Sequence, residues 1–296
     1  LQVVGIAYLA SCVLVVLAVM GSSQAMKVAW VEDLLSLVPP LVFLVSLRWV
    51  SRPPSPEHPY GHHRAIASAH LASAVALLAM GAFMVVDSGM GLVKAAHPPI
   101  GTYHLFGQTV WAGWLMIAAM VYTGIGPVIL GHLKKPLAEK LHDKVLWADA
   151  EMNAADWRTA GAAIIGILGI GVGWWWADAV AALLIATSIV RDGGKGIGDA
   201  LRDLMDGEAR THDDERTHPL VDAVLTAANG PAAVRVRDQG HLLHAEVFVV
   251  PSAPVELADL EALVDTIQGL DWKLNDVVVV PVSRLPDAVR ATPAAG

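Results

Sequence analysis

One polar stretch, LWADAEMNAADWR at residues 146–158, opens an otherwise apolar run of the chain. Within it Asp149, Asn153 and Asp156 recur at i, i+4 and i+7, so a helix would stack them along one face, beside Met152. A carboxylate inside a membrane costs about 2.5 to 3.5 kcal/mol and usually faces a bundle interior or a water-filled cavity. This face is therefore a candidate site for a cation.

An alternative interpretation places these groups at the membrane surface. Asp149 and Glu151 would then lie among the lipid headgroups, and Asp156 would pair with Arg158. We favour cation binding for Asp156, because it is the deepest acid on this segment. For Asp149 both interpretations stay open.

The composition indicates an integral membrane protein. Of the 296 residues, 55% are hydrophobic and only 16% are charged, which is far more apolar than a soluble protein of this size. The net charge of −8 belongs to the C-terminal part, because residues 196–296 hold 17 acids and 8 bases. Such an acidic part argues against nucleic acid or anionic lipid as its partner. Cys12 is the single cysteine, which excludes a disulfide framework.

Six apolar segments are each long enough to cross the hydrocarbon core of a bilayer, at about 1.5 Å per residue. The chain begins at Leu1 without a basic segment or a small-residue cleavage site, so we expect a trimmed membrane helix there rather than a signal peptide. Pro39 and Pro40 should kink the second helix. The transmembrane domain is predicted at residues 1–192, with helices at 1–26, 28–47, 65–93, 105–130, 145–171 and 173–190.

Lysine and arginine are distributed unevenly between the expected loops. Nine of them fall on one side of the membrane and two on the other, which predicts that both termini are cytoplasmic. The nine are Arg48, Arg52, Arg64, Lys134, Lys135, Lys140, Lys144, Arg191 and Lys195, and the two are Lys27 and Lys94.

The pattern changes to short soluble elements beyond a predicted linker at residues 193–217. Residues 218–285 should form a cytosolic α+β domain in the order αββαβ, which is typical of a two-layer, ferredoxin-like fold. The Pro- and Ala-rich residues 286–296 are expected to be a disordered tail. The elements are predicted at 219–228, 233–238, 242–250, 255–268 and 277–282. No Walker loop, G-x-S-x-G or H-E-x-x-H motif occurs, so the sequence favours neither a nucleotide-driven pump nor an enzyme.

A second polar helix face is expected at a depth similar to that of Asp156. Measured from Arg48 and Lys144, Ser36 and Asp156 each lie about 18 Å deep and Glu32 lies about 24 Å deep. Glu32 and Ser36 share a face at i and i+4. Two carboxylates and several neutral oxygens between two helices would chelate a divalent cation, and such oxygens admit Mn, Fe, Co, Zn, Cd or Mg.

These residues resemble a known family, the cation diffusion facilitators, over nearly the whole chain. The features that carry the resemblance are the six membrane helices, the αββαβ domain, the loop HPYGH at 58–62, the pair Asp149 and Asp156, and Ala177 followed by Asp178. The resemblance implies a homodimeric antiporter that exchanges divalent metal ions for protons by alternating access and exports the metal from the cytoplasm. It implies a bacterial cytoplasmic membrane as the location and no resident cofactor.

The chain departs from the family at the central site, which usually has D-x-x-x-D on the second helix and H-x-x-x-D or D-x-x-x-D on the fifth. Matching the motifs places Glu32 and Ser36 at the first pair, and Met152 and Asp156 at the second. Only two of these four are acids. We therefore expect Glu32 and Asp156 to bind the ion, either with a preference other than zinc or with a different set that recruits Asp33, Asn153, Asp149 or His70.

Three histidines are weaker candidates. His70 is interpreted first as a hydrogen-bonded interior residue of the third helix. His241 and His244 bracket a strand in the domain that carries regulatory metal sites in similar proteins, yet the strand at 277–282 offers no ligand. The depleted central site also leaves an alternative function, a membrane metal sensor that binds without translocating.

Overall fold

The chain folds into two compact units in the computed structural model. The first unit comprises residues 1–48 and 69–198, and the second comprises residues 49–68 and 199–296. The structure describes residues 2–50, 52, 54–95, 97, 99–105, 108–141, 144–211, 216–240, 242–274, 276–287 and 290–291.

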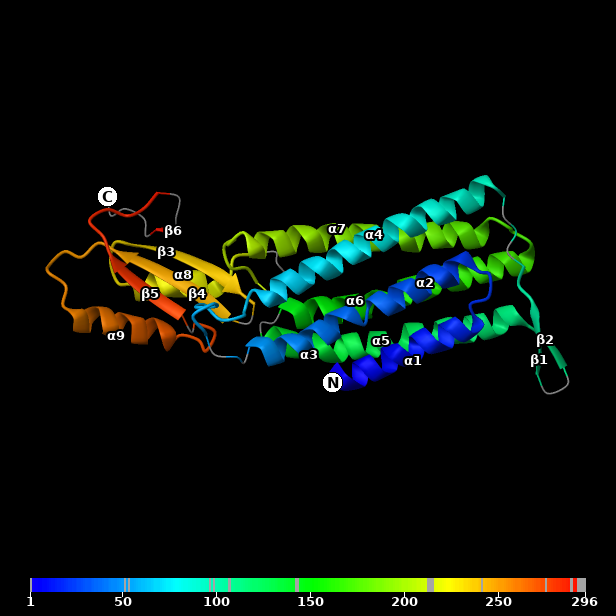
Figure 1. The fold of residues 1–296 in the computed structure, drawn as a ribbon, viewed down its shortest axis with the longest axis horizontal. Coiled ribbons are helices and arrows are strands. Elements are labelled where there is room, and N and C mark those ends of the chain that lie inside the picture. The colour runs from blue at the N-terminus through cyan, green and yellow to red at the C-terminus, as the bar shows by residue number, and fades with distance from the viewer. Residues whose placement is uncertain are drawn as a thin grey trace. The chain divides into compact units, whose positions relative to one another are not determined.

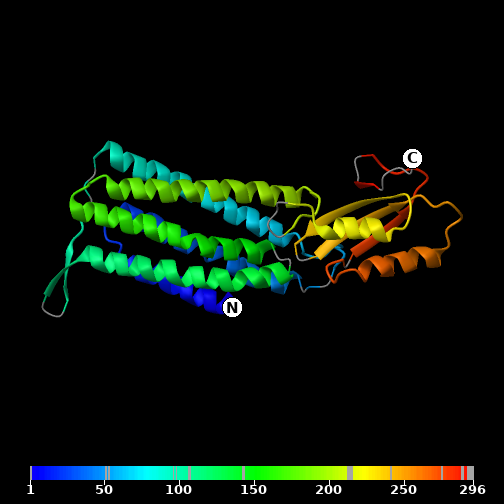
Figure 2. The ribbon, with the colours of Figure 1, turned by 180° about the vertical axis from the view of Figure 1, so that it is seen from behind.

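The first unit is a helical bundle (Figure 1). The helices α5 and α6 run side by side along much of their length (Figures 1 and 2), α1 packs on α5, and α2 packs on both α1 and α6. An antiparallel hairpin of β1 (Thr102–Leu105) and β2 (Gln108–Trp111) precedes α5. The helices are α1 (Gln2–Val19), α2 (Gln24–Leu35), α3 (Val38–Val50), α4 (Ala65–Val93), α5 (Ala112–Leu141), α6 (Lys144–Val172) and α7 (Ala177–Leu204).

Small residues let α5 and α6 approach closely. A Cβ added at Gly131 would lie 2.6 Å from the carbonyl oxygen of Ala150 and 2.7 Å from the backbone nitrogen of Ala154. A Cβ added at Gly124 would lie 2.7 Å from the Cβ of Ala160. Close backbone approach at small residues is how helices pack where lipid removes the hydrophobic driving force. This contact fixes the two helices that carry most of the polar groups described below.

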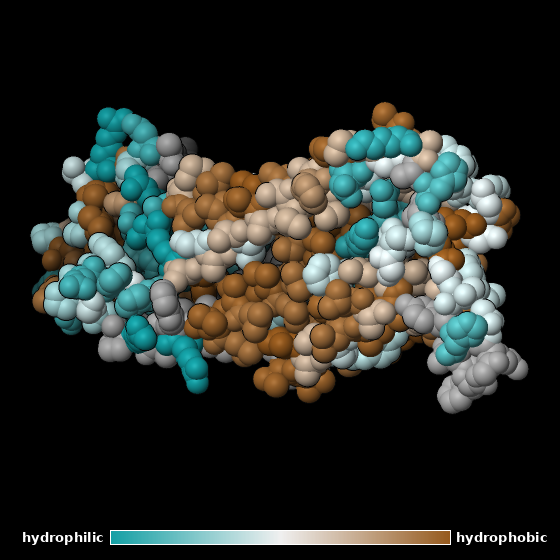
Figure 3. All heavy atoms as spheres, turned by 45° about the vertical axis from the view of Figure 1, so that its right-hand side comes forward, coloured by the Kyte–Doolittle hydropathy of each residue, from teal (hydrophilic) through white to brown (hydrophobic). Residues whose placement is uncertain are grey.

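Several helices of this unit have the length and composition of membrane spans. Among the described residues, the segments 65–93, 112–140 and 149–172 are long and apolar enough to cross a bilayer, and Val3–Val19 is a shorter apolar helix. Large apolar side chains such as Phe83, Ile125 and Ile165 are exposed on these helices. Figure 3 shows hydrophobic residues covering much of the visible helical surface. The N-terminal unit is therefore membrane-like.

The expected second helix, at residues 28–47, is two helices. α2 ends at Leu35, and α3 begins at Val38. Pro39 and Pro40 have no backbone N–H, so they cannot continue the i to i−4 ladder, and the break falls one turn earlier. The N–H of Ser36 still donates to the Glu32 carbonyl at 2.8 Å. The prolines thus end the helix directly after its two acids.

The first helix also ends earlier than expected. α1 stops at Val19, before Gly21, which has a φ of +52° that favours glycine. Ser23 then caps α2, because its side chain accepts a hydrogen bond from the Met26 N–H. The helix expected at residues 28–47 therefore begins at Gln24 instead.

Two other helices extend beyond their predicted ends. α5 begins at Ala112 rather than residue 105, because the hairpin occupies the start, and it continues to Leu141 through a segment expected to be a charged loop. Leu, Ala, Glu and Lys are strong helix formers, and they carry the helix past Pro136. α7 continues to Leu204, so the first part of the expected linker at 193–217 is helical.

The second unit contains a small mixed sheet with helices packed on it. β3 and β4 pair antiparallel, β4 and β5 pair parallel, and the strand order is β5-β4-β3-β6. α8 contacts β3 and β4, α9 contacts β5, and the two helices contact each other, so both cover one face. The elements are α8 (Pro219–Ala227), β3 (Ala232–Gln239), β4 (Leu242–Val249), α9 (Leu257–Gln268), β5 (Asp276–Pro281) and β6 (Arg290–Ala291).

The core between this sheet and its helices is built from alternating strand residues. Val234, Val236, Ala245 and Val247 are buried together with Val224 of α8. The expected disordered tail at 286–296 is ordered where β6 pairs with β3, with Val234 opposite Arg290. Arg290 also forms ion pairs with Glu208 and Asp222, which offset the cost of ordering this segment.

Candidate metal centre

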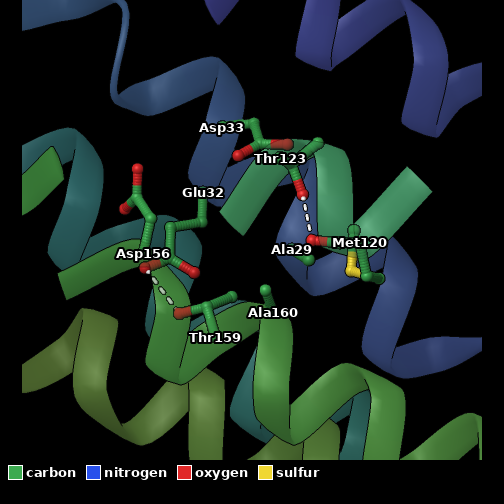
Figure 4. Close-up of a pocket in the computed structure, with 8 residues that line it drawn as sticks. All are labelled: Ala29, Glu32, Asp33, Met120, Thr123, Asp156, Thr159 and Ala160. Atoms are coloured by element: carbon green, nitrogen blue, oxygen red, sulfur yellow. Dashed lines mark hydrogen bonds between the residues drawn. The ribbon is translucent and has the colours of Figure 1, made fainter. Parts of the chain in front are cut away.

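A small cavity of about 10 Å³ lies between α2, α5 and α6 (Figure 4). Its volume is that of roughly one water-sized species. Its polar lining consists of three carboxylates and two hydroxyls, and the rest is apolar. The residues are Glu32 and Asp33 from α2, Thr123 and Met120 from α5, and Asp156, Thr159, Ala160 and Ala29 from α6 and α2.

The carboxylates in this cavity are incompletely hydrogen-bonded. Thr159 donates a hydrogen bond through Oγ1 to Glu32 Oε1 at 3.1 Å, and Figure 4 shows these two side chains directed toward one another, with Asp156 beside them. Glu32 Oε2, Asp33 Oδ2 and Asp156 Oδ2 are buried without a hydrogen-bond partner among the described residues. A buried carboxylate oxygen without a donor is costly unless a cation, a proton or water satisfies it. The cavity therefore has the electrostatics of a cation site.

The local sequence explains how three acids reach one cavity. Glu32 and Asp33 are consecutive, so they point about 100° apart on α2, and both line the cavity because α2 lies against α5 and α6. Asp156 and Thr159 are one turn apart on α6 and share a face. No group of three or more His, Cys, Asp or Glu side chains in the described ranges is arranged to hold a metal ion. The three carboxylates surround the cavity without converging on a common point.

The other two residues expected at the central site contact each other. The Ser36 hydroxyl donates to the sulfur of Met152 at 3.3 Å, which links the end of α2 to α6. Neither residue lines the cavity. The structure therefore places Glu32 and Asp156 together with Asp33, and it places Ser36 and Met152 in a separate contact.

Asp149 and Asn153 form a second polar cluster with Lys134 of α5. Lys134 Nζ donates to Asp149 Oδ2 at 2.7 Å, with side chains 0% and 2% exposed. Asn153 donates through Nδ2 to Asp149 Oδ1 at 2.9 Å and to the Asp149 carbonyl at 2.6 Å. His70 is on α4 beside Gly196 of α7 and does not line the cavity.

Of the two candidate histidines in the second unit, the structure describes His244. His244 Nδ1 lies 2.7 Å from Asp276 Oδ2, and its Nε2 lies 3.5 Å from Glu246 Oε1, so carboxylates face both ring nitrogens. Asp276 begins β5 directly opposite His244 in the parallel register, one residue before the strand that was expected to supply no ligand. His241 lies outside the described residues.

Sequence reasoning missed three polar residues of these two clusters. Thr159 follows Asp156 by three positions, so its position on the acidic face was readable from helical spacing. Thr123 has no local signal, because its place at the cavity depends on the packing of α5. Lys134 was assigned to a loop, and the observed helix instead carries it into the bundle, where it is fully buried.

A membrane-like helical unit with an acidic cavity, followed by a small sheet domain, defines a membrane protein that handles cations. Residues 1–205 match the model of the cation efflux transmembrane domain, and the chain belongs to this family. The resemblance to the cation diffusion facilitators is thereby confirmed, and the chain is a transporter-family protein rather than an enzyme.

Curated relatives are similar over most of their length. The uncharacterized transporter YdbO of Bacillus subtilis is 23% identical over 93% of this chain and 90% of its own. The manganese efflux system protein MneS of the same organism is 22% identical over 87% of this chain and 84% of its own. The cation-efflux pump FieF of Pectobacterium atrosepticum is 23% identical over 90% of this chain and 87% of its own.

Proposed function

We propose that this protein exports a divalent metal cation from the cytoplasm in exchange for protons, by alternating access, with the ion held between α2 and α6. The observation that carries the proposal is the cavity in which Glu32, Asp33 and Asp156 each keep a buried oxygen without a hydrogen-bond donor among the described residues. Two ionised carboxylates balance one dication. Membership of the cation efflux family supports the direction of transport.

Coupling to protons follows from the ligands themselves. A carboxylate must lose its proton to bind a metal ion, so metal and protons compete for Glu32, Asp33 and Asp156. After the metal ion leaves on the far side, protons can bind the same carboxylates. The empty site then returns to the cytoplasmic side without an unbalanced buried charge. Antiport then needs no separate proton path through the protein.

We further propose that the transported ion belongs to the hard, oxygen-preferring class, with manganese as the leading candidate. Among the described residues the cavity is lined by carboxylate and hydroxyl oxygens and by neither imidazole nor thiolate, and the sulfur that lines it is the neutral thioether of Met120 (Figure 4). The sulfur of Met152 accepts a hydrogen bond from Ser36 outside the cavity. Oxygen ligands suit Mn and Mg, whereas imidazole and thiolate favour Zn. The name of the relative MneS, a manganese efflux protein, supports this preference.

The proposal includes an arrangement in the membrane. The broken pair α2 and α3 would form one span, and α1, α4, α5, α6 and α7 would form five more, with both termini in the cytoplasm of a bacterial cell. The excess of Lys and Arg on one side supports this orientation. In this orientation, the end of α6 at Lys144 is cytoplasmic.

We propose a homodimer that the cytosolic unit stabilises. Its exposed apolar side chains include Leu257, Trp272 and Val278, which a second copy would cover. Full-length protein at micromolar concentration in mild detergent should have the mass of a dimer by light scattering. A monodisperse monomer under these conditions would contradict the dimer without affecting the transport proposal.

Uptake into proteoliposomes tests the function. Purified protein is reconstituted with a pH-sensitive dye inside, and Mn²⁺, Zn²⁺, Co²⁺, Cd²⁺ and Mg²⁺ are added outside one at a time. We expect metal accumulation coupled to counter-movement of protons, with Mn²⁺ favoured over Zn²⁺. Tight metal binding without accumulation would contradict transport and favour the alternative function, a membrane metal sensor. Accumulation without proton movement would retain transport and refute the antiport.

A further inference from the structure

A lysine and an aspartate form an ion pair inside the bundle, away from the cavity. Lys134 of α5 donates to Asp149 of α6 at 2.7 Å, and both side chains are almost completely buried. Burying a charged pair costs several kcal/mol per ion, and an apolar pair of similar size is often as stable or more stable. Charged groups inside a membrane-spanning bundle therefore indicate a function by default.

The packing around Lys134 holds its ammonium against Asp149. Gly131, one turn earlier on α5, brings that helix into near backbone contact with Ala150 and Ala154 of α6. On the other side, a Cβ added at Gly5 of α1 would lie 3.3 Å from Lys134 Nζ. Gly131 thus brings α6 close to this part of α5, and Gly5 leaves room for the ammonium. Its position is a built site for a positive charge.

A line of oxygens leads from this site to the cavity. Asp149, Asn153 and Asp156 share one face of α6, and seven residues, about 10 Å, separate the two acids. Asn153 uses its amide nitrogen on Asp149, while its Oδ1 is buried without a partner in the described part of the chain. Asp156 Oδ2 is unpartnered as well. Asn153 therefore lies between Asp149 and Asp156 along α6, with an acceptor oxygen that no described residue uses.

We propose that Asp149 and Asn153 form a relay site for the transported dication, and that the Lys134 ammonium is a tethered cation that occupies this site until the metal displaces it. The proposal rests on the proposed function, because it concerns the path by which metal reaches Glu32, Asp33 and Asp156. In the proposed orientation the relay lies on the cytoplasmic side. A metal ion replaces Lys134 at Asp149, passes the oxygen of Asn153 and reaches Asp156.

The tethered charge has two consequences for transport. It keeps Asp149 neutralised in the absence of metal, so the relay does not hold a second ion permanently. It also repels a second dication while Lys134 is in place, so one ion is loaded at a time. A pair that serves only to hold α5 and α6 together would not exchange its lysine for metal, so its removal would leave the KM for transport unchanged, which makes the two roles separable.

The test compares full-length variants in nanodiscs and proteoliposomes. Lys134→Met removes the competing ammonium from Asp149, and we expect about tenfold tighter apparent Mn²⁺ affinity with a slower maximal rate, because the relay releases its ion less readily. The double variant Lys134→Met/Asp149→Asn removes the relay and both charges, leaving no unbalanced ion to prevent folding. For it we expect Mn²⁺ affinity at the central cavity within about threefold of wild type, and a KM for transport raised about tenfold.

Lys135→Met is the matched control, because it removes the neighbouring positive charge, which lies over the Trp147 ring rather than at Asp149. A KM in the double variant equal to that of wild type would overturn the relay and leave a structural ion pair. Equal shifts in Lys135→Met and Lys134→Met would also overturn it, because the effect would then be one of net charge. Failure of the proposed function would give a different result. Wild-type proteoliposomes would then accumulate no metal, and Asp156→Asn would cause no loss of accumulation.

Discussion

Two acids on the same face of α6, Asp149 and Asp156, differ in what balances their charge. Asp149 faces the ammonium of Lys134 and the amide of Asn153. Asp156 instead shares a cavity with Glu32 and Asp33, and each of these three acids keeps a buried oxygen without a donor among the described residues. One position on the helix therefore has a resident cation from the protein, and the other is available to a cation from solution.

This difference gives the two acids opposite effects on the stability of the empty bundle. The paired acid contributes to the fold as long as its partner is present, because removing one member leaves a buried charge alone. The unpaired acids lower the stability of the empty bundle and are retained where an ion or protons bind. Variants of Glu32, Asp33 and Asp156 should therefore change transport with little loss of stability, whereas variants of Lys134 and Asp149 should change stability in addition to the transport effects expected of the relay.

The largest effect is expected at Asp156. Asp156→Ala should abolish metal transport, with a loss of at least about a hundredfold in initial rate, because even residues around metal ligands change affinity by about 10 to 100-fold. The folded protein should elute normally in size-exclusion chromatography, since the change removes an unbalanced buried charge. Glu151→Gln is the control, because Glu151 is an exposed acid on the same helix. Wild-type uptake by Asp156→Ala would remove Asp156 from the site.

On the paired side, the largest effect should be on folding. Lys134→Met leaves Asp149 buried without its cation, and we expect a loss of about 3 to 5 kcal/mol in stability. Adding Asp149→Asn to this variant should restore most of the loss. Thermal unfolding in detergent measures the loss and its restoration, with the fraction of protein that remains monodisperse as the readout. A double variant no more stable than Lys134→Met would mean that the pair does not exist in the membrane.

A smaller effect on transport is expected at Glu32, and it depends on pH. As the metal-loading side becomes more alkaline, carboxylates lose protons and bind metal better, so wild-type uptake should rise with pH. Glu32→Gln keeps the size and one oxygen but removes this titration, so we expect weaker binding and a flatter pH profile. Asp33→Asn should do less, because Thr159 orients Glu32 toward α6. An inactive Asp33→Asn beside a normal Glu32→Gln would reverse their ranking.

The acidic face of α6 was predictable because its residues are close in sequence. Asp149, Asn153 and Asp156 repeat at helical spacing, and the apolar run after them indicates a helix that enters a membrane. The order of elements in the second unit was also predictable, since alternating apolar residues distinguish its strands from its helices. Both inferences depend on the spacing of polar and apolar residues, which can be read from short stretches of the sequence.

The partners of these acids depend on contacts between helices, which periodicity does not contain. Lys134 was assigned to a loop because a run of charges around Pro136 is typical of one, whereas α5 continues to Leu141 and Gly131 packs closely on α6. Beside the helix break, Ser36 contacts Met152, while Asp33 lines the cavity. Asp276 was missed because its relation to His244 is a matter of strand register.

The smallest effect tests how far the unpaired acids depend on hydroxyls. Thr159 donates a hydrogen bond to Glu32 Oε1 at 3.1 Å within the cavity. Thr159→Val removes the donor and keeps the branched shape, and a hydrogen bond to a charged group contributes about 1.5 to 3 kcal/mol. Part of this is recovered when the metal itself orients Glu32, so we expect KM to rise about three- to tenfold with little change in maximal rate. Thr159→Ser keeps the hydroxyl and should behave as wild type in the same uptake assay. If Thr159→Val lowers the maximal rate while KM stays constant, Thr159 acts in the conformational change instead, and Glu32 does not need its donor to bind the ion.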